Sequence, residues 1–380
     1  MKIDAATLTS DLIQCPSVTP IEGGALVLLE GLLKDAGFET TRVDRNGVPN
    51  LFARLGPKGA GRTFGFNGHT DVVPAGNEGS WSHPPFSGVI VDGEIWGRGA
   101  TDMKSGVAAF VAACIDFADD LPKDDALIVT VTGDEEGPSK DGTVALLDWM
   151  QANGEQMTVC LVGEPSNPTK MGEMIKIGRR GSITFAVDAK GVQGHAAYPH
   201  KTKNPVHALV RLLGDLTATP LDAGTAHFEP SGLQVTTFDV GNQATNVVPE
   251  HARAVFNIRF NDAHSSQSLI AEIQKKADAV AADTGVSFAI TTDCSGESFV
   301  TEPGPFVDLV RAVAREATTL DPELSTGGGT SDARFIQSHC PVVEFGLVGR
   351  YMHEVNERVP VEQVRQLAGI YRTILERYFA

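Results

Sequence analysis

The chain has 380 residues, which at about 150 residues per domain predicts two or three domains rather than one core. Hydrophobic residues make up 42% of the chain and charged residues 21%, a composition typical of globular proteins. The formal net charge of -17 argues against a nucleic acid or an anionic membrane as a partner, because both bind basic surfaces. An anionic small molecule is still allowed, since it needs only a local basic pocket.

The amino-terminal segment and the cysteines predict a cytoplasmic protein. MKIDAATLTSDL contains Asp4 and no apolar core, so no signal peptide is expected. No stretch approaches the roughly 18 to 20 apolar residues that span a bilayer, so no membrane association is expected either. Five widely spaced cysteines without a CxxC pair indicate reduced, packed thiols: Cys15, Cys114, Cys160, Cys294 and Cys340.

The first part of the chain alternates between helical and strand patterns. Leucines recur on one face of 21–36 and Gly37 follows, which predicts a helix and its end. Further along the chain, strands are expected over 48–55 and 62–68 and a buried helix over 104–119. Two short apolar strands are expected over 126–133 and 158–163. Such alternation predicts an α/β domain built on a mixed or parallel sheet.

The middle of the chain changes character. From residue 181 to residue 295 the patterns read strand, helix, strand, strand, helix, strand, which is the βαββαβ order of a ferredoxin-like module. After residue 296 the α/β pattern resumes with a helix near 304–317, a strand over 341–347 and a last helix. We therefore expect one domain formed by 1–180 and 296–380, and a second domain inserted over 181–295.

Histidines and carboxylates follow the ends of four predicted strands. The carboxyl ends of parallel strands form the ligand-binding edge of an α/β sheet, so these side chains are expected to converge. The alternative for any single one of these residues is that it lies on a solvent-exposed acidic rim and binds nothing. They are His69, Asp71, Glu135, Glu136, Glu164 and His353, and Asp102 joins them from the loop before helix 104–119.

Several carboxylates that converge in a cleft repel one another, and bound cations relieve the repulsion. Two histidines with three or four carboxylates and no cysteine suit two zinc, cobalt or manganese ions. Asp71 lies two residues after His69 and is expected to accept its second ring N–H. Of the adjacent Glu135 and Glu136, one is expected to bind metal and the other to act as a general base.

Other active-site motifs are missing from the sequence. There is no GxSxG elbow, no GxxxxGK[ST] phosphate loop and no GxGxxG after a first strand. The stretch HEVNE at 353–357 ends in Glu357 where a zincin helix would carry a histidine, so that helix is excluded.

Several longer motifs resemble a known family. GHTDVVP (68–74), GRGATDMKSG (97–106), GDEEG (133–137), VGEPS (162–166) and the late histidine are similar to the di-zinc aminoacylase and glutamate carboxypeptidase-type metallopeptidases. GRRGS, QGHAAYPH and GGTSDARF narrow the resemblance to the members that act on N-succinyl-LL-2,6-diaminopimelate. The similarity covers nearly the whole chain.

The resemblance implies two Zn²⁺ per subunit, with Co²⁺ or Mn²⁺ as substitutes. His69, Asp102 and Glu164 would hold one ion, and Asp102, Glu136 and His353 the other, so that Asp102 bridges them. It further implies that Glu135 is the catalytic acid and base and that Asp71 is the partner of His69. A cis peptide bond is expected between Asp102 and Met103.

The resemblance also implies that the inserted domain is a lid and a dimerisation domain. His195 of the partner subunit would stabilise the oxyanion, and Asn246 would cross the dimer interface. The carboxylates of the substrate would be held by Arg179, Ser182, Arg259, Thr330 and Arg334. Gly349 and Arg350 depart from the family, whose members often carry a Leu-Asn pair before the late histidine.

The activity implied is that of a homodimeric amidohydrolase in lysine and meso-diaminopimelate biosynthesis. It would hydrolyse N-succinyl-LL-2,6-diaminopimelate to succinate and LL-2,6-diaminopimelate. Two alternatives stay open from the sequence. One is another activity of the same family, such as an N-acetylornithine deacetylase, an acylamino-acid hydrolase or a dipeptidase. The other is a catalytically silent relative that only binds a ligand or a protein.

Overall fold

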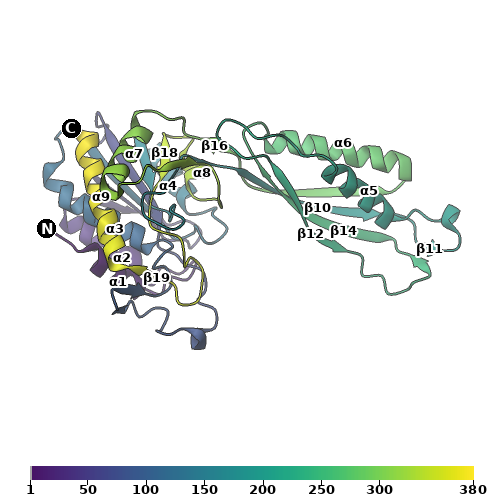
Figure 1. Ribbon diagram of the computed structural model, residues 1–380, viewed down its shortest axis with the longest axis horizontal. Helices are drawn as coiled ribbons and strands as arrows, with labels where there is room; N and C mark the ends of the chain where they lie inside the picture. The colour runs from purple at the N-terminus through teal and green to yellow at the C-terminus, as the bar shows by residue number, and fades with distance from the viewer. Residues whose placement is uncertain (1) are drawn as a thin grey trace. The chain divides into compact units, whose positions relative to one another are not determined.

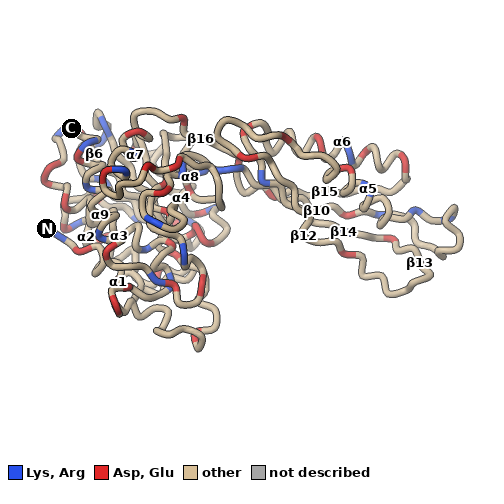
Figure 2. The backbone as a smooth tube through the Cα atoms, viewed as in Figure 1, with Lys and Arg blue, Asp and Glu red and all other residues tan. Residues whose placement is uncertain are grey.

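The computed structural model describes residues 2–380 and divides the chain into two compact units (Figure 1). The first unit contains the chain up to Gly178 together with Thr301–Ser325 and Ser331–Ala380. The second unit contains Arg179–Val300 and the short segment Thr326–Thr330. Within the described residues, no helix combines the length and the apolar character needed to cross a membrane. Acidic and basic residues are interspersed over both units (Figure 2).

An eight-stranded mixed sheet forms the centre of the first unit, so the predicted fold class is confirmed. The four central strands run parallel, and the neighbours on either side of them pair antiparallel. In sheet order the strands are β1 (Glu39–Arg42), β2 (Asn50–Leu55), β6 (Ala126–Thr132), β3 (Thr63–His69), β7 (Val159–Val162), β18 (Val342–Glu344), β8 (Met174–Lys176) and β17 (Glu323–Ser325).

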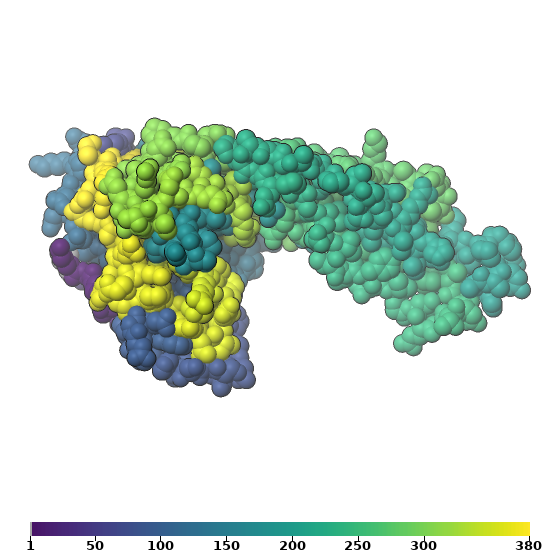
Figure 3. All heavy atoms as spheres, in the orientation of Figure 1, coloured from purple at the N-terminus to yellow at the C-terminus, as the bar shows by residue number. Residues whose placement is uncertain are grey.

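Helices cover both faces of this sheet. Side chains alternate along β3: Phe66 stacks on Phe110 of α3 with a ring-centroid distance of 3.7 Å, whereas the amide of Asn67 lies 3.1 Å from Thr143 of α4. The helices α7 and α9 adjoin on the face seen in Figure 3. The helices of this unit are α1 (Ala5–Ile13), α2 (Ala25–Asp35), α3 (Lys104–Phe117), α4 (Thr143–Asn153), α7 (Pro305–Thr318), α8 (Ala333–Ile336) and α9 (Val361–Phe379).

A small three-stranded sheet joins two loops that are far apart in the sequence. Its middle strand β5 (Glu94–Trp96) pairs antiparallel with β4 (Ile90–Val91) and with β19 (Arg358–Pro360). Asp102 lies shortly after β5, and His353 lies shortly before β19. The pairing therefore brings the segments that carry Asp102 and His353 to the same place.

The second unit is a four-stranded antiparallel sheet in the order β12-β14-β10-β15. The helices α5 and α6 pack against each other along this sheet (Figure 1), and Phe185 stacks on Phe256 beneath them at 5.0 Å. The main elements follow one another as β10 (Gly181–Lys190), α5 (Pro205–Thr217), β12 (Gly232–Asp239), β14 (His251–Phe260), α6 (Ser266–Thr284) and β15 (Ser287–Gly296). The short strands are β9 (Gly178–Arg179), β11 (Gly194–His195), β13 (Val247–Val248) and β16 (Phe299–Val300).

Asp222 holds together the loop that precedes β12. Its Oδ1 accepts hydrogen bonds from Gly224 N and Asn261 Nδ2, each at 2.7 Å, and its Oδ2 lies 3.0 Å from His264 Nε2. Burial works to raise the pKa of Asp222, but hydrogen bonds from Ser231, Gly224 and Asn261 outweigh it and lower the pKa to about 2. The charged carboxylate is therefore the form that stabilises the fold.

We predict that Asp222→Asn lowers the free energy of unfolding of the second unit by about 1.5–3 kcal/mol at neutral pH, the range for hydrogen bonds to a charged group. Because the folded pKa is depressed, this contribution is present above pH 3.8 and is lost as the pH falls through about 2. Hydrogen-exchange protection of α6 at several pH values measures the difference. A difference as large near pH 2 as at pH 7, or an equal loss in the exposed control Asp239→Asn, would contradict the prediction.

Candidate metal centre

Three neighbouring parallel strands deliver the first half of the site. His69 is the last residue of β3, and it stands opposite Thr132, the last residue of β6. Glu135 and Glu136 follow β6, and Glu164 follows the end of β7. Since β6, β3 and β7 are adjacent and parallel, these side chains meet at one edge of the sheet, as predicted from the strand ends.

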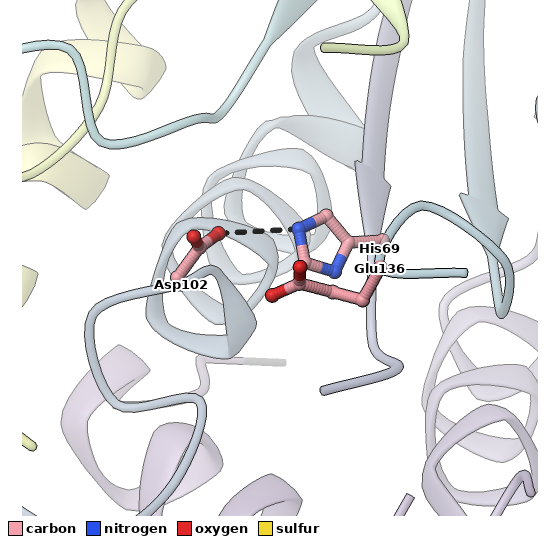
Figure 4. Close-up of side chains that lie close together, drawn as sticks. All are labelled: His69, Asp102 and Glu136. Atoms are coloured by element: carbon pink, nitrogen blue, oxygen red, sulfur yellow. Dashed lines mark hydrogen bonds and ion pairs between the residues drawn. The ribbon is translucent and has the colours of Figure 1, made fainter. Parts of the chain in front are cut away.

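Asp102 reaches His69 from the turn before α3, and Glu136 approaches from the loop after β6 (Figure 4). His69 Nε2 lies 3.2 Å from Asp102 Oδ1 and 3.6 Å from Glu164 Oε1. Potential ligand atoms of His69, Asp102 and Glu136 all lie within 4.8 Å of one another, as do those of His69, Glu135 and Glu164. His69, Asp102 and Glu164 are all buried.

His353 completes a second half of the site from the loop before β19. Its Nε2 lies 3.2 Å from Asp102 Oδ2 and 2.8 Å from Glu136 Oε1. The two oxygens of Asp102 thus face two different histidines, and Asp102 is shared between the two halves. The expected cis peptide bond between Asp102 and Met103 is confirmed.

Asp71 lies beside His69, but the structure differs from the expected hydrogen bond. His69 Nδ1 lies 2.9 Å from the backbone oxygen of Asp71 and 3.6 Å from its Oδ1. The Asp71 carboxylate instead accepts from Thr19 Oγ1 at 2.7 Å and from the backbone N–H groups of Glu135 and Glu136 at 3.2 Å and 3.1 Å. Asp71 therefore orients the imidazole through its carbonyl and the Glu135–Glu136 loop through its carboxylate.

The side chains of the candidate metal centre carry more negative than positive charge, and their pKa values shift as a result. Burial, opposed by His69, raises the pKa of Glu135 to about 8, and neighbouring Asp332 and Asp102 add to the increase. Burial together with Asp102 raises the pKa of Glu164 well above its usual range. Hydrogen bonds to Asp102 and Glu136 raise the pKa of His353 to about 10. Without cations, protons therefore neutralise the site.

The donor set fits a pair of divalent cations. Two imidazoles and three carboxylates are borderline-hard ligands of the kind that Zn²⁺, Co²⁺ and Mn²⁺ accept. His69 and Glu164 would bind one cation, and Glu136 and His353 would bind the other. Asp102 would contribute one carboxylate oxygen to each of the two sites. Glu135 lies beside His69 and Glu164, where its carboxyl could transfer a proton.

The residues predicted to hold the substrate are mostly in the second unit. Ser182 and Arg259 stand opposite each other on β10 and β14, and Arg179 donates to the carbonyl of Gly327 at 3.4 Å. Burial and the neighbouring Arg180 lower the pKa of the half-buried Arg259. Two arginine side chains therefore lie near each other in this part of the second unit.

His195 and Asn246 are exposed residues on adjacent segments of the second unit. β11 pairs with β13, and the N–H of Ala196 donates to the backbone oxygen of Asn246 at 2.9 Å. Thr330 ends the segment Thr326–Thr330 of the same unit.

The remaining predicted positions lie in the first unit. Arg334 lies in α8, where its guanidinium covers the ring of Phe335 at 4.6 Å. At the position that departs from the family, Gly349 N donates to the backbone oxygen of Asn167 at 2.9 Å and Arg350 covers the ring of Tyr351 at 5.2 Å.

Thr19 and Asp332 also lie next to the site, although neither was expected there from the sequence. Thr19 donates to Asp71, as described above. Asp332 is buried and accepts from Thr143 Oγ1 at 2.7 Å, and burial raises its pKa to about 6 despite this hydrogen bond. Asp332 lies in the motif GGTSDARF, which could have identified it as a site residue, whereas Thr19 lies in no such motif.

We predict that metal binding to the metal-free protein releases protons and strengthens as the pH rises. His353, with a pKa of about 10, is protonated at neutral pH and must lose its proton before it can bind a cation. Titration calorimetry with Zn²⁺ in two buffers of different ionisation enthalpy counts the protons released. An affinity that does not change between about pH 6 and pH 9 would contradict this account of the site.

Comparisons with known proteins agree over nearly the full chain. The sequence profile of the peptidase family M20/M25/M40 matches residues 65–377. A protein of Paracoccus denitrificans is 69% identical over 378 residues, 99% of each chain, and one of Cereibacter sphaeroides is 63% identical over 380 residues, 100% of each chain. Both relatives are named succinyl-diaminopimelate desuccinylase.

Solved structures share the fold at low sequence identity. The aminopeptidase PepT of Bacillus cereus aligns with a TM-score of 0.79 at 21% identity and covers 98% of this chain and 97% of its own. The YXEP protein of Bacillus subtilis, described as a dinuclear metal-binding peptidase from the M20 family, aligns with a TM-score of 0.73 at 15% identity and covers 99% and 98%. With its profile match and its close relatives, this chain belongs to the peptidase family M20/M25/M40.

Proposed function

We propose that this chain is a di-zinc amidohydrolase that converts N-succinyl-LL-2,6-diaminopimelate to succinate and LL-2,6-diaminopimelate in lysine and meso-diaminopimelate biosynthesis. The observation that carries the reaction class is Asp102, whose two carboxylate oxygens face His69 and His353, with Glu135 beside them. The substrate follows from relatives that are 63–69% identical over full length and are named for this reaction.

His69 and Glu164 would hold one zinc ion, Glu136 and His353 the other, and Asp102 would bridge them. When bound, the two cations supply Lewis acidity, which polarises the amide carbonyl and lowers the pKa of water. Glu135 is the proton carrier in this proposal. It accepts the proton of the attacking water and returns it to the leaving amine. Its place beside His69 and Glu164 supports this role, because a carboxyl there lies next to the cation that would activate the water.

Asp71 would act through three other residues. Its carbonyl fixes the ring of His69, and its carboxylate fixes the backbone of Glu135 and Glu136. Proton transfer depends steeply on distance, so holding the backbone of Glu135 at two neighbouring amides keeps its carboxyl within reach of the water.

The second unit would bind the substrate and complete the site. The substrate carries several carboxylates. They suit the arginines Arg179, Arg259 and Arg334 and the hydroxyl groups of Ser182 and Thr330. The neighbouring Arg180 and Arg259 support an anion there, because a carboxylate would offset their mutual repulsion. We further propose a cytoplasmic homodimer formed through this unit, in which Asn246 crosses the dimer interface to the substrate and the partner subunit's His195 stabilises the oxyanion.

Turnover of N-succinyl-LL-2,6-diaminopimelate should require metal. We expect amide loss by the purified protein to stop with a chelator and to return when Zn²⁺ is added. N-Acetylornithine, assayed beside it, should be cleaved far more slowly because it lacks the succinyl carboxylate. Faster cleavage of N-acetylornithine would show that the chain has another activity of the same family. If the zinc-loaded protein cleaved no acylated amino acid, the chain would instead be a catalytically silent relative.

Glu135→Gln should separate proton transfer from metal binding. The amide cannot carry the proton, so we expect kcat to fall about 10²- to 10⁴-fold, with both zinc ions still bound. The matched change at the next residue, Glu136→Gln, should instead weaken metal binding because Glu136 pairs with His353. Zinc analysis of the two purified variants alongside steady-state kinetics distinguishes the roles, and full activity of Glu135→Gln would remove Glu135 from the mechanism.

A further inference from the structure

Arg98 and Glu357 form a buried ion pair next to the metal centre that the proposed mechanism does not use. Their side chains are only 3% and 1% exposed, and Arg98 Nη1 donates to Glu357 Oε2 at 2.7 Å. A buried ion pair gains little net stability, because the desolvation of both charges offsets their attraction. The contacts of the pair with the surrounding backbone therefore show better what it does.

Glu357 holds the loop that carries Asp102. Its Oε1 accepts from the backbone N–H groups of Thr101 at 2.7 Å and of Asp102 at 3.1 Å, and its Oε2 accepts from the N–H of Gly99 at 3.1 Å. The backbone of Glu357 also accepts from the N–H of Gly97 at 3.0 Å. One carboxylate thus fixes three peptide units, including that of the shared ligand.

Arg98 extends the same contact to the loop that carries the second histidine. Its Nη2 lies 3.5 Å from the backbone oxygen of His353, and its Nη1 donates to the backbone oxygen of Glu354 at 3.3 Å. Nη2 also donates to the carbonyl of Pro74 at 3.4 Å, in the segment that follows His69 and Asp71. The guanidinium therefore ties together three separate loops of the first unit.

The two halves of the metal centre differ in what else supports them. His69 ends β3 and Glu164 follows β7, so the hydrogen bonds of the central sheet fix both ligands. His353 lies in an irregular loop, is 46% exposed and has a φ of 62°. Its position relative to Asp102 depends on the pairing of β5 with β19 and on Arg98 and Glu357.

We propose that Arg98 and Glu357 are positioning residues that set the geometry of the cation site formed by Asp102, Glu136 and His353. The pair contacts the backbone N–H of Asp102 and the backbone oxygen of His353. It therefore fixes the distance between Asp102 and His353, two ligands that occur together in this cation site and not in the other. The inference rests on the metal centre of the proposed function, but it does not depend on the substrate. A purely structural pair would instead support the whole unit without favouring one cation site.

Glu357→Gln tests the proposal with little change in volume. The amide keeps one acceptor oxygen but presents an NH₂ group to backbone donors or to Arg98. Stepwise titration of the metal-free variant with Zn²⁺ against a chromophoric chelator measures both affinities. We expect the second affinity to fall about ten- to a hundredfold, the usual effect of losing a group that orients a ligand. The first affinity should fall much less, because that site shares Asp102 but not His353. The absorption spectrum of the second bound Co²⁺ should change as well.

Two further variants control for stability. Arg98→Lys keeps the charge but loses the fork that reaches two loops, and it should also weaken the second site selectively. Asp125→Asn is the matched control: Asp125 is 6% exposed and pairs with Arg62 at 2.7 Å. It lies before Ala126, at the opposite end of β6 from the metal centre. Asp125→Asn should lower the unfolding temperature and leave both zinc affinities as they are.

The outcomes separate the possibilities. Equal weakening of both sites, or no weakening, in folded Glu357→Gln would overturn the proposal, and Arg98→Lys decides if Glu357→Gln does not fold. An unsubstituted chain that binds two zinc ions without cleaving the succinyl substrate would contradict the proposed substrate and leave this inference standing. An unsubstituted chain that binds fewer than two would remove the metal centre and this inference together.

Discussion

Mutual repulsion among buried carboxylates is the constraint on which the site depends. Parallel strands bring acids to one edge of the sheet, and Asp102 adds another from a loop. In the chain alone, raised pKa values at Glu135 and His353 show how protons relieve this repulsion. Two divalent cations would relieve it better and would leave Glu135 as the group that exchanges protons. Metal binding, proton uptake and catalysis thus follow from one electrostatic arrangement.

Asp102, the proposed shared ligand, connects the two halves of that arrangement, and it is not part of the central sheet. Its place is fixed by a loop held by Glu357, by the pairing of β5 with β19 and by the turn into α3. The first unit therefore combines two kinds of support. The central sheet provides the rigid half of the centre, and the loops provide the half that includes His353.

The strand-end residues could be predicted from the sequence because their positions follow from local pattern and sheet geometry. His69, Glu135 and Glu164 each come directly after a short apolar run, and the carboxyl ends of such strands share one edge. The helix expected over 21–36 begins only at Ala25, because Gly23 and Gly24 take positive φ angles. The acceptor of His69 Nδ1 and the contacts of Glu357 could not be predicted, since they depend on tertiary contacts between loops. The βαββαβ order of the second unit could be predicted from the sequence. That order does not reveal which side chains the sheet brings together, such as Ser182 and Arg259.

Zinc-edge anomalous diffraction from crystals of the zinc-loaded protein would show whether Asp102 is shared by two cations. We expect two anomalous peaks on either side of the Asp102 carboxylate, one in contact with His69 and Glu164 and the other with Glu136 and His353. A single peak, or two peaks that do not share Asp102, would contradict it.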